Sequence, residues 1–259
     1  MGWEEAGRGW GARAVEWAYL NEPYAKAAND LLFDHLHVDA GIRYLDIACG
    51  SGLAASTARR RGAEVSGLDA SEALVRIARA RTPDGDFRVG DMFDPPFASD
   101  SFDVVTSFNG IWKGCELALA GARRVLRSDG RLGLTFWGRP NRIGLMPYFM
   151  KIIELSPPSH QSASMEQGDT GRAGVLEEML AATGFALIER GTVEAVNEWP
   201  DVATAVRGLA AAGPAVPAIE AVGYETFCAA LAETIAPLCD RDLGVRIVSE
   251  LGWVTAKPA

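Results

Sequence analysis

Short apolar runs alternate with helical stretches along most of the chain after residue 40. The apolar runs predict strands, at residues 42–48, 64–68, 86–89, 102–108, 131–137 and 185–190. Apolar positions three or four residues apart predict helices, at residues 53–61, 72–81, 111–126 and 172–182. Ser71 is placed to cap the second of these helices, and Arg81 to complement the dipole at its far end. This alternation predicts an α/β fold in which a parallel sheet has helices on both faces.

Three stretches depart from that rhythm. Residues 1–39 are rich in tryptophan and tyrosine and favour helices interrupted at Pro23, which suits a lid. Residues 138–172 contain a turn, a helix at 143–155 and a polar stretch, which is typical of a segment that faces a substrate. Residues 201–242 predict short helices before an extended segment at 244–257. We therefore expect four parts: a helical lid (1–39), a cofactor-binding core (40–137), an acceptor-side insertion (138–172) and the remaining α/β core (173–259), with 201–242 as a helical crossover.

Composition and charge narrow the class of protein. Hydrophobic residues make up 48% of the chain and charged residues 23%, as in a globular protein with one large core. The net charge of −9 and the pI near 4.9 argue against a nucleic-acid partner, which needs a basic surface. Since no apolar run approaches about 20 residues, we expect a cytoplasmic protein without a membrane span. Four scattered cysteines predict neither a disulfide framework nor a metal site, and the Ala/Gly/Arg-rich usage suggests a bacterial source.

A glycine-rich loop follows the first predicted strand, with the sequence Leu-Asp-Ile-Ala-Cys-Gly-Ser-Gly at residues 45–52. Gly50 and Gly52 allow the backbone to approach a ligand closely, and the helix that begins at Leu53 favours a negative group at its N-terminus. The loop also fits the dinucleotide pattern G-x-G-x-x-G/A. It therefore predicts a nucleotide-like cofactor and leaves its identity open.

Acidic residues end three successive predicted strands and favour one cofactor. Asp46 can hold an ammonium group through a water molecule, whereas it would repel a pyrophosphate. Asp69 can accept hydrogen bonds from both ribose hydroxyls. Asp91 can accept one from an adenine amino group while the backbone of Met92 contacts the ring edge. Each acid could instead form a cap or a turn, but the three together favour a cofactor with an amino-acid part and a nucleoside part.

At these motifs the chain resembles the class I S-adenosylmethionine (SAM)-dependent methyltransferases, near their small-molecule and quinone methyltransferases. Residues 45–52 match the family's acid-x-G-x-G-x-G motif, with Ala48 in place of the first glycine. The other matches lie in residues 67–71, 90–92, 97–105 and 126–132. The N-terminal and 138–172 segments match no motif.

The resemblance implies a doubly wound, Rossmann-like sheet of seven mostly parallel strands in the order 3-2-1-4-5-7-6. Residues 244–257 would be its inserted antiparallel strand. The implied cofactor is SAM, and no metal is required. The residues expected to bind it are Asp46, Ala48, Gly50, Gly52, Asp69, Ala70, Asp91, Met92, Asn109 and Trp112. Trp112 fits either a ring stacked over the sulfonium or a core aromatic.

The implied reaction is an in-line methyl transfer to oxygen or nitrogen, less readily to carbon, of a small molecule such as a secondary metabolite or a quinone-like ring. His160 is the candidate catalytic base, and the weaker alternatives are Tyr19, Tyr24, Glu154 and Glu166. Proximity alone, with no base, is equally compatible with the sequence.

Two other functions stay open at the level of sequence. A protein of the same fold could use SAM for its charge, in a cyclisation, an elimination or a decarboxylation, or act only as a binding partner. An NAD-dependent oxidoreductase is less favoured, because a Tyr-x-x-x-Lys pattern is missing after the fourth strand. We expect a monomer or a homodimer.

Overall fold

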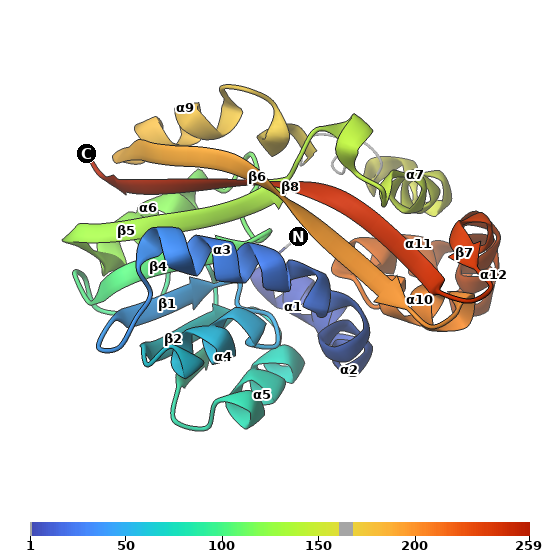
Figure 1. Cartoon of the computed structure of the whole chain (residues 1–259), viewed down its shortest axis with the longest axis horizontal. Helices are drawn as coiled ribbons and strands as arrows, with labels where there is room; N and C mark the ends of the chain where they lie inside the picture. The colour runs from blue at the N-terminus through green and yellow to red at the C-terminus, as the bar shows by residue number, and fades with distance from the viewer. Residues whose placement is uncertain (1, 161–167) are drawn as a thin grey trace.

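The computed structural model describes residues 2–160 and 168–259 and shows one continuous mixed sheet (Figure 1). Its order is β3-β2-β1-β4-β5-β8-β6, with β7 paired to β8, which confirms the predicted topology. The strands β1 to β5 run parallel, and β8 lies antiparallel between β5 and β6. The bounds are β1 (Arg43–Ile47), β2 (Glu64–Asp69), β3 (Asp86–Val89), β4 (Phe102–Phe108), β5 (Leu126–Trp137), β6 (Phe185–Trp199), β7 (Cys239–Asp240) and β8 (Gly244–Pro258).

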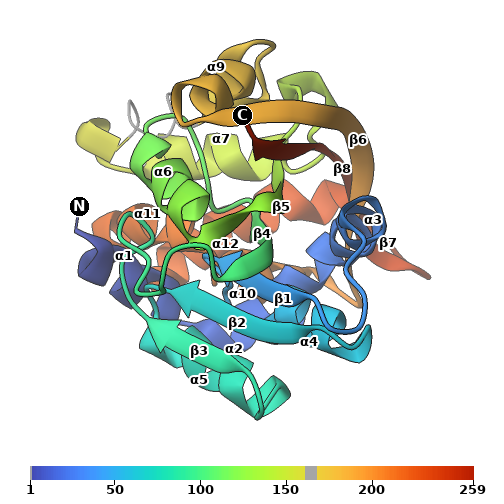
Figure 2. The ribbon, with the colours of Figure 1, turned by 90° about the vertical axis from the view of Figure 1, so that its left-hand side faces the viewer.

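Helices cover both faces of this sheet (Figure 2). One face carries α3 (Lys26–Leu36), α4 (Leu53–Arg60) and α5 (Glu72–Arg81), and the other carries α6 (Glu116–Val125) and α9 (Val175–Ala182). Neighbouring residues of β1 point to opposite faces, so Tyr44 joins the apolar cluster under α3 and α4 while Leu45 joins the cluster under α6. The central strands are therefore buried on both sides, as their apolar runs predict.

The N-terminal segment is helical, as predicted, but its helix type changes twice. It consists of α1 (Trp3–Gly11), α2 (Ala14–Glu16), the π-helical turn η1 (Trp17–Asn21) and the 3₁₀ turn η2 (Glu22–Ala25) before α3. Pro23 lies at the start of η2, where its missing N–H costs no helical hydrogen bond. Two backbone oxygens of this segment, those of Ala18 and Leu20, accept hydrogen bonds from side chains elsewhere in the fold.

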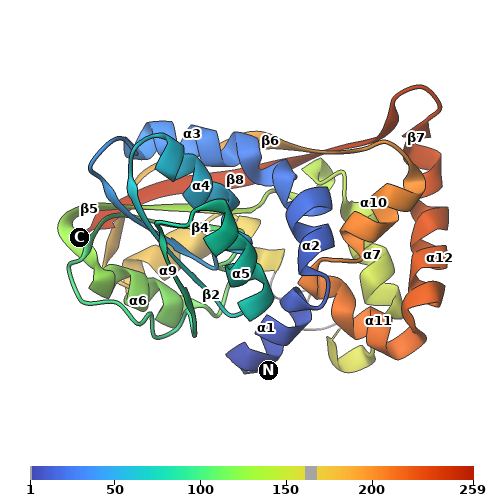
Figure 3. The ribbon, with the colours of Figure 1, turned by 90° about the horizontal axis from the view of Figure 1, so that it is seen from below.

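The strand predicted at 185–190 is too short. In the structure β6 continues to Trp199 and pairs with β8 over the length of both, which forms a two-stranded arm beyond the core sheet (Figure 3). Residues 191–199 carry exposed acids, and their pairing partner lies about 50 residues further along the chain. No local apolar run therefore marked this half of the strand.

Four helices pack on the arm around an apolar cluster of their own (Figure 3). They are α7 (Met146–Leu155), α10 (Val202–Leu209), α11 (Val216–Val222) and α12 (Tyr224–Ile235). Short 3₁₀ turns complete the connections at η3 (Pro140–Arg142), η4 (Gly168–Gly171), η5 (Gly213–Ala215) and η6 (Ala236–Leu238). Across residues 2–160 and 168–259, no single helix is long and apolar enough to cross a membrane, although the bent pair Val202–Leu209 and Gly213–Val222 passes that test jointly.

Three predicted helices start later than expected, each for a local reason. The helix predicted from residue 111 begins at Glu116, because a turn that contains Gly114 at φ +96° precedes it. The helix predicted from 143 begins at Met146, since Ile143 and Gly144 pair with β8 instead. The helix predicted from 172 begins at Val175, after Gly174 at φ +90°. The strand predicted at 131–137 begins earlier, at Leu126, and its pairing with β4 shifts register between Leu126 and Arg131.

Candidate cofactor site

The glycine-rich loop connects the carboxyl end of β1 to α4 through left-handed backbone conformations. Ala48, Gly50 and Gly52 have φ values of +59°, +55° and +77°. A Cβ atom on Gly52 would lie 2.7 Å from Cβ of Ala78 on α5, so only glycine fits there. Ala48 holds the same backbone region with a side chain, at the position where the family motif has its first glycine.

Asp69 ends β2, the neighbour of β1, and its carboxylate holds the loop. Its Oδ2 accepts a hydrogen bond from the backbone N–H of Gly50 at 2.8 Å, and its Oδ1 accepts one from that of Ser71 at 2.8 Å. A carboxylate has about four acceptor positions, so two remain for the hydroxyls of a ribose. Burial raises the pKa of Asp69 to about 6.

Asp46 lies inside β1, beneath the loop, with 2% of its surface exposed. Its Oδ1 accepts a hydrogen bond from Oγ1 of Thr106 at 2.9 Å, and that hydroxyl is 2.5 Å from the hydroxyl of Tyr44. Burial raises the pKa of Asp46 well above its usual range, and the charges of Glu22 and Asp69 add to the effect. The acid therefore belongs to a hydrogen-bonded row between β1 and β4.

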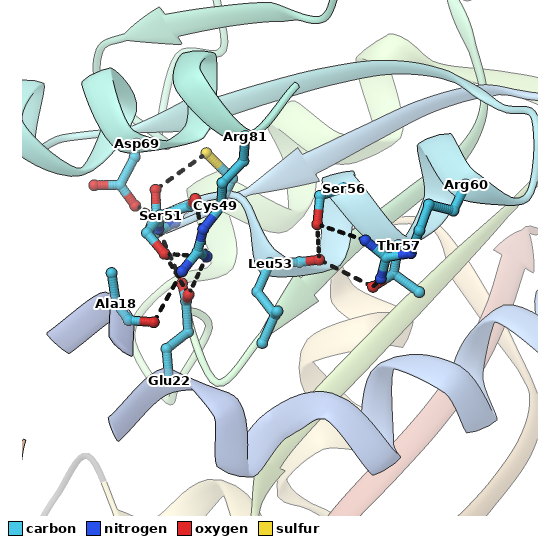
Figure 4. Close-up of polar contacts among 11 residues, drawn as sticks. Ala18, Glu22, Cys49, Ser51, Leu53, Ser56, Thr57, Arg60, Asp69 and Arg81 are labelled. Carbon is cyan, nitrogen blue, oxygen red and sulfur yellow. Dashed lines mark hydrogen bonds and ion pairs between the residues drawn. The ribbon is translucent and has the colours of Figure 1, made fainter. Parts of the chain in front are cut away.

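Glu22 and Arg81 also lie at the loop, and the sequence did not indicate them (Figure 4). Oε1 of Glu22 accepts a hydrogen bond from the backbone N–H of Ser51 at 2.9 Å, and Oε2 accepts from the Ser51 hydroxyl and from Nη1 of Arg81, the latter at 2.7 Å. Their side chains are only 9% and 17% exposed. Glu22 comes from the N-terminal segment and Arg81 from the end of α5, so no local pattern links them.

Three acids meet at the loop, and burial raises the pKa of each of them. Glu22 and Asp46 are buried and Asp69 is partly buried. Within the described part of the chain, the ion pairs to these acids come from Arg81 alone, which binds Glu22. A positive ligand would favour the ionised form of such buried acids, whereas a pyrophosphate would oppose it. The cluster therefore suits the sulfonium and ammonium groups of SAM better than the pyrophosphate of NAD.

The remaining predicted cofactor-binding residues follow the ends of β3 and β4. Asp91 follows β3 and accepts a hydrogen bond from the backbone N–H of Phe93 at 2.9 Å. Met92 and Trp112 are partly buried against the core cluster under α6. At the end of β4, Asn109 has φ +55°, and its side-chain nitrogen donates to the hydroxyl of Tyr24 at 2.9 Å.

The N-terminal segment lies directly on the end of β2. A Cβ atom on Gly7 would be 2.1 Å from the backbone oxygen of Ala70, and one on Gly11 would be 2.7 Å from Oγ of Ser71. Since α1 leaves no room for a side chain at these contacts, it packs directly on Ala70 and Ser71, the residues that follow Asp69.

An aromatic group stands beside Asn109, and we define it as Tyr24, Trp137, Tyr148 and Phe149. The rings of Tyr24 and Trp137 stack with centroids 5.8 Å apart, and Trp137 meets Phe149 edge-on at 5.1 Å. Burial raises the pKa of Tyr24 to about 12, so its hydroxyl keeps its proton near neutral pH. The group joins the N-terminal segment, β5 and α7.

The predicted bases occupy different places. His160 follows α7, and its Nδ1 lies 3.3 Å from Oγ of Ser159. Glu154 pairs with Lys151 at 2.6 Å on the surface, and Tyr19 is 62% exposed. Glu166 lies outside the described residues. Of the candidates named, Tyr24 is the one whose hydrogen bond ties it to the end of β4. Among residues 2–160 and 168–259, no group of three or more His, Cys, Asp or Glu side chains could hold a metal ion.

Comparison with known proteins identifies the family. The profile described as "Methyltransferase domain" matches residues 45–134. A demethylmenaquinone methyltransferase of Clavibacter sepedonicus is 30% identical over 173 residues, 60% of this chain and 70% of the relative. Nocamycin O-methyltransferase of Saccharothrix syringae is 37% identical over 114 residues, 40% of this chain and 41% of the relative. The chain spans less than half the length of several such relatives.

Solved structures with the same fold are more distant in sequence. The YcgJ protein of Bacillus subtilis superposes with a TM-score of 0.58 at 18% identity, over 89% of this chain and 97% of that one. The cyclase SpnF superposes with a TM-score of 0.59 at 21% identity, over 90% of this chain and 81% of that one. Together with the relative from Clavibacter, the strand order and the motif at residues 45–52 show that the chain belongs to the class I methyltransferases, a family whose cofactor is S-adenosylmethionine.

Proposed function

We propose that this protein transfers a methyl group from SAM to an oxygen or nitrogen atom, less readily a carbon atom, of a small-molecule acceptor. The observation that carries the proposal is the cluster of acids at the glycine-rich loop, where Glu22, Asp46 and Asp69 meet and Arg81 pairs with Glu22. The net charge of −9 argues against a nucleic-acid acceptor, and relatives such as nocamycin O-methyltransferase support a secondary metabolite.

The residues at the strand ends divide the cofactor between them. We assign the amino-acid part to the loop at Ala48, Gly50 and Gly52, with Asp46 behind it, and the ribose to Asp69 beside Ala70. We assign the binding of the adenine ring to Asp91 and Met92. When bound, SAM supplies a methyl group that its sulfonium already activates. The chain's task is then to bind and orient both reactants and to exclude water.

The acceptor side is assigned to the lid at residues 1–39 and the insertion at 138–172. The aromatic group lies between them and suits a planar, apolar acceptor. Tyr24 accepts a hydrogen bond from Asn109, which leaves its own proton to donate. We therefore assign Tyr24 the orientation of an acceptor oxygen, retain His160 as the base, and keep Trp112 as a neighbour of the sulfonium.

The test is a product assay with SAM and a panel of phenolic, quinol-like and amine acceptors, read by mass spectrometry. Methyl transfer requires S-adenosylhomocysteine and an acceptor product heavier by one CH₂ group, in equal amounts. If the acceptor is converted and no S-adenosylhomocysteine forms, the protein does not transfer methyl groups and instead uses the cofactor for its charge. Binding of NADH with no response to SAM would reject both functions.

A further inference from the structure

Three residues, Glu22, Ser51 and Arg81, form what we call the loop clamp, and it ties the N-terminal segment to the glycine-rich loop (Figure 4). Nη1 of Arg81 donates to Oε2 of Glu22 at 2.7 Å and to Oγ and the backbone oxygen of Ser51 at 2.5 and 3.2 Å. Ser51 is fully buried. A buried ion pair of this kind is costly to break from one side, because the remaining charge loses its partner.

The backbone of the N-terminal segment reinforces the loop clamp. In the π-helical turn η1, the oxygen of Ala18 accepts a hydrogen bond from Nη2 of Arg81 at 2.9 Å. The oxygen of Leu20 in the same turn accepts one from Nε1 of Trp199 on the arm at 2.5 Å. Insertions of this type are frequent at functional sites. The segment is thus fixed to the core on one side and to the arm on the other.

The loop clamp lies on the residues assigned to the cofactor. A Cβ atom on Gly50 would be 2.8 Å from Oε1 of Glu22, so the carboxylate stands directly over that glycine. The N–H of Gly50 is held by Asp69 and the next N–H, of Ser51, by Glu22. The two acids therefore fix successive peptide groups of one loop from two sides, and α1 covers Ala70 beside it.

From this geometry we infer that Glu22 is a positioning residue that locks the N-terminal segment over the cofactor and so controls its affinity and its exchange. The inference rests on the proposed function. A cofactor that lies between the loop and this segment leaves only when the loop clamp opens. Glu22 acts through the loop and the segment, so its loss affects cofactor retention more than the rate of the bound complex.

The test compares Glu22→Gln with the wild type by stopped-flow displacement of SAM, followed by tryptophan fluorescence. The rings of Trp10 and Trp17 are 4.8 Å apart in the same segment and supply the signal. We expect the dissociation rate and the KM for SAM to rise at least tenfold, with kcat at saturating SAM within twofold of the wild type. The Glu22→Gln/Arg81→Gln double variant should raise the dissociation rate by less than the product of the two single effects, because the two residues share one ion pair.

Glu16→Gln is the matched control. Glu16 lies in the same segment but pairs with Arg207 of α10 at 3.6 Å, away from the loop. Its dissociation rate for SAM should equal that of the wild type. Ser51→Ala removes the hydroxyl contacts and leaves the ion pair, so it should raise the dissociation rate of SAM about threefold. This variant replaces Glu22→Gln as the test if Glu22→Gln does not fold.

Three outcomes would overturn the inference. One is an unchanged dissociation rate in Glu22→Gln and Ser51→Ala, and another is an equal rise in Glu16→Gln, which would indicate general loosening of the segment. A fall in kcat with an unchanged KM for SAM would make Glu22 part of the reaction instead. A wild-type protein that does not bind SAM would reject the proposed function as well, whereas the first three outcomes leave that function standing.

Discussion

At the scale of single residues, the site depends on conformations and charges that are unfavourable by themselves. Ala48 holds a left-handed backbone with a side chain, at φ +59°. Asp46 and Glu22 are acids in buried positions, and burial raises the pKa of both. Such local costs persist where the surrounding structure fixes them, and they gather at functional sites.

Replacement of Ala48 by glycine should stabilise the protein. Glycine adopts the left-handed region without a penalty, so we expect the free energy of unfolding to rise by about 1 kcal/mol, measured by urea denaturation. Ala55 in α4 provides the control, because Ala55→Gly in a helix should lower that free energy by roughly 0.5–1 kcal/mol. Equal losses in both variants would show that no strain resides at Ala48.

The affinity for SAM should depend on the ionisation of Asp69. Its pKa of about 6 means that the ribose hydroxyls meet a carboxylate at pH 7 and mostly a carboxylic acid at pH 5. We expect the affinity to rise about tenfold between pH 5 and pH 7, by calorimetric titration. Because burial raises the folded pKa above the unfolded one, folding has the opposite trend, and this group's contribution to stability is lost as the pH rises through 6.

Asp69→Asn is the control for that pH profile. The amide keeps one oxygen for the N–H of Gly50 but does not titrate. Its affinity for SAM should be lower at pH 7 and nearly flat over the same range. A profile that stays as steep as in the wild type would assign the dependence to another group, with Glu22 and Asp46 the nearest acids.

At the scale of elements, the sequence predicted the strands that a short local apolar pattern marks. The strands β1 to β4 have such patterns, and helices follow β1, β2 and β4. The second half of β6 was missed, because its burial alternates only from Ala195 to Trp199 and depends on pairing with β8. Helix starts shifted where a glycine turn or a pairing with β8 delayed them.

A close contact joins β6 to β8 within the core sheet, where β8 also pairs with β5. A Cβ atom on Gly191 of β6 would lie 2.6 Å from the ring of Trp253 on β8. Gly191→Ala should therefore lower the free energy of unfolding by about 1–3 kcal/mol, as overpacking does. Measured in urea, the exposed neighbour Glu194→Ala should change it by less than about 0.5 kcal/mol. A neutral Gly191→Ala would mean that the strands separate freely there.

At the scale of the whole molecule, the N-terminal segment connects parts that the sequence treats separately. Glu22 contacts the glycine-rich loop, and Tyr24 contacts Asn109 and Trp137. Asn21 accepts a hydrogen bond from Asn197 on the arm at 3.0 Å. The motif acids at the strand ends could be predicted, since each follows an apolar run. The contacts of Glu22 and Tyr24 could not, because they join residues that are 29 and 85 positions apart.

The acids at the loop lead to the most direct test of the cofactor assignment. Isothermal titration calorimetry of the unmodified protein, with SAM and in parallel with NADH, measures which of the two cofactors binds at the site of Glu22, Asp46, Asp69 and Arg81. We predict saturable, one-to-one binding of SAM and no measurable heat with NADH at the same concentrations. Tight binding of NADH with none of SAM would contradict it.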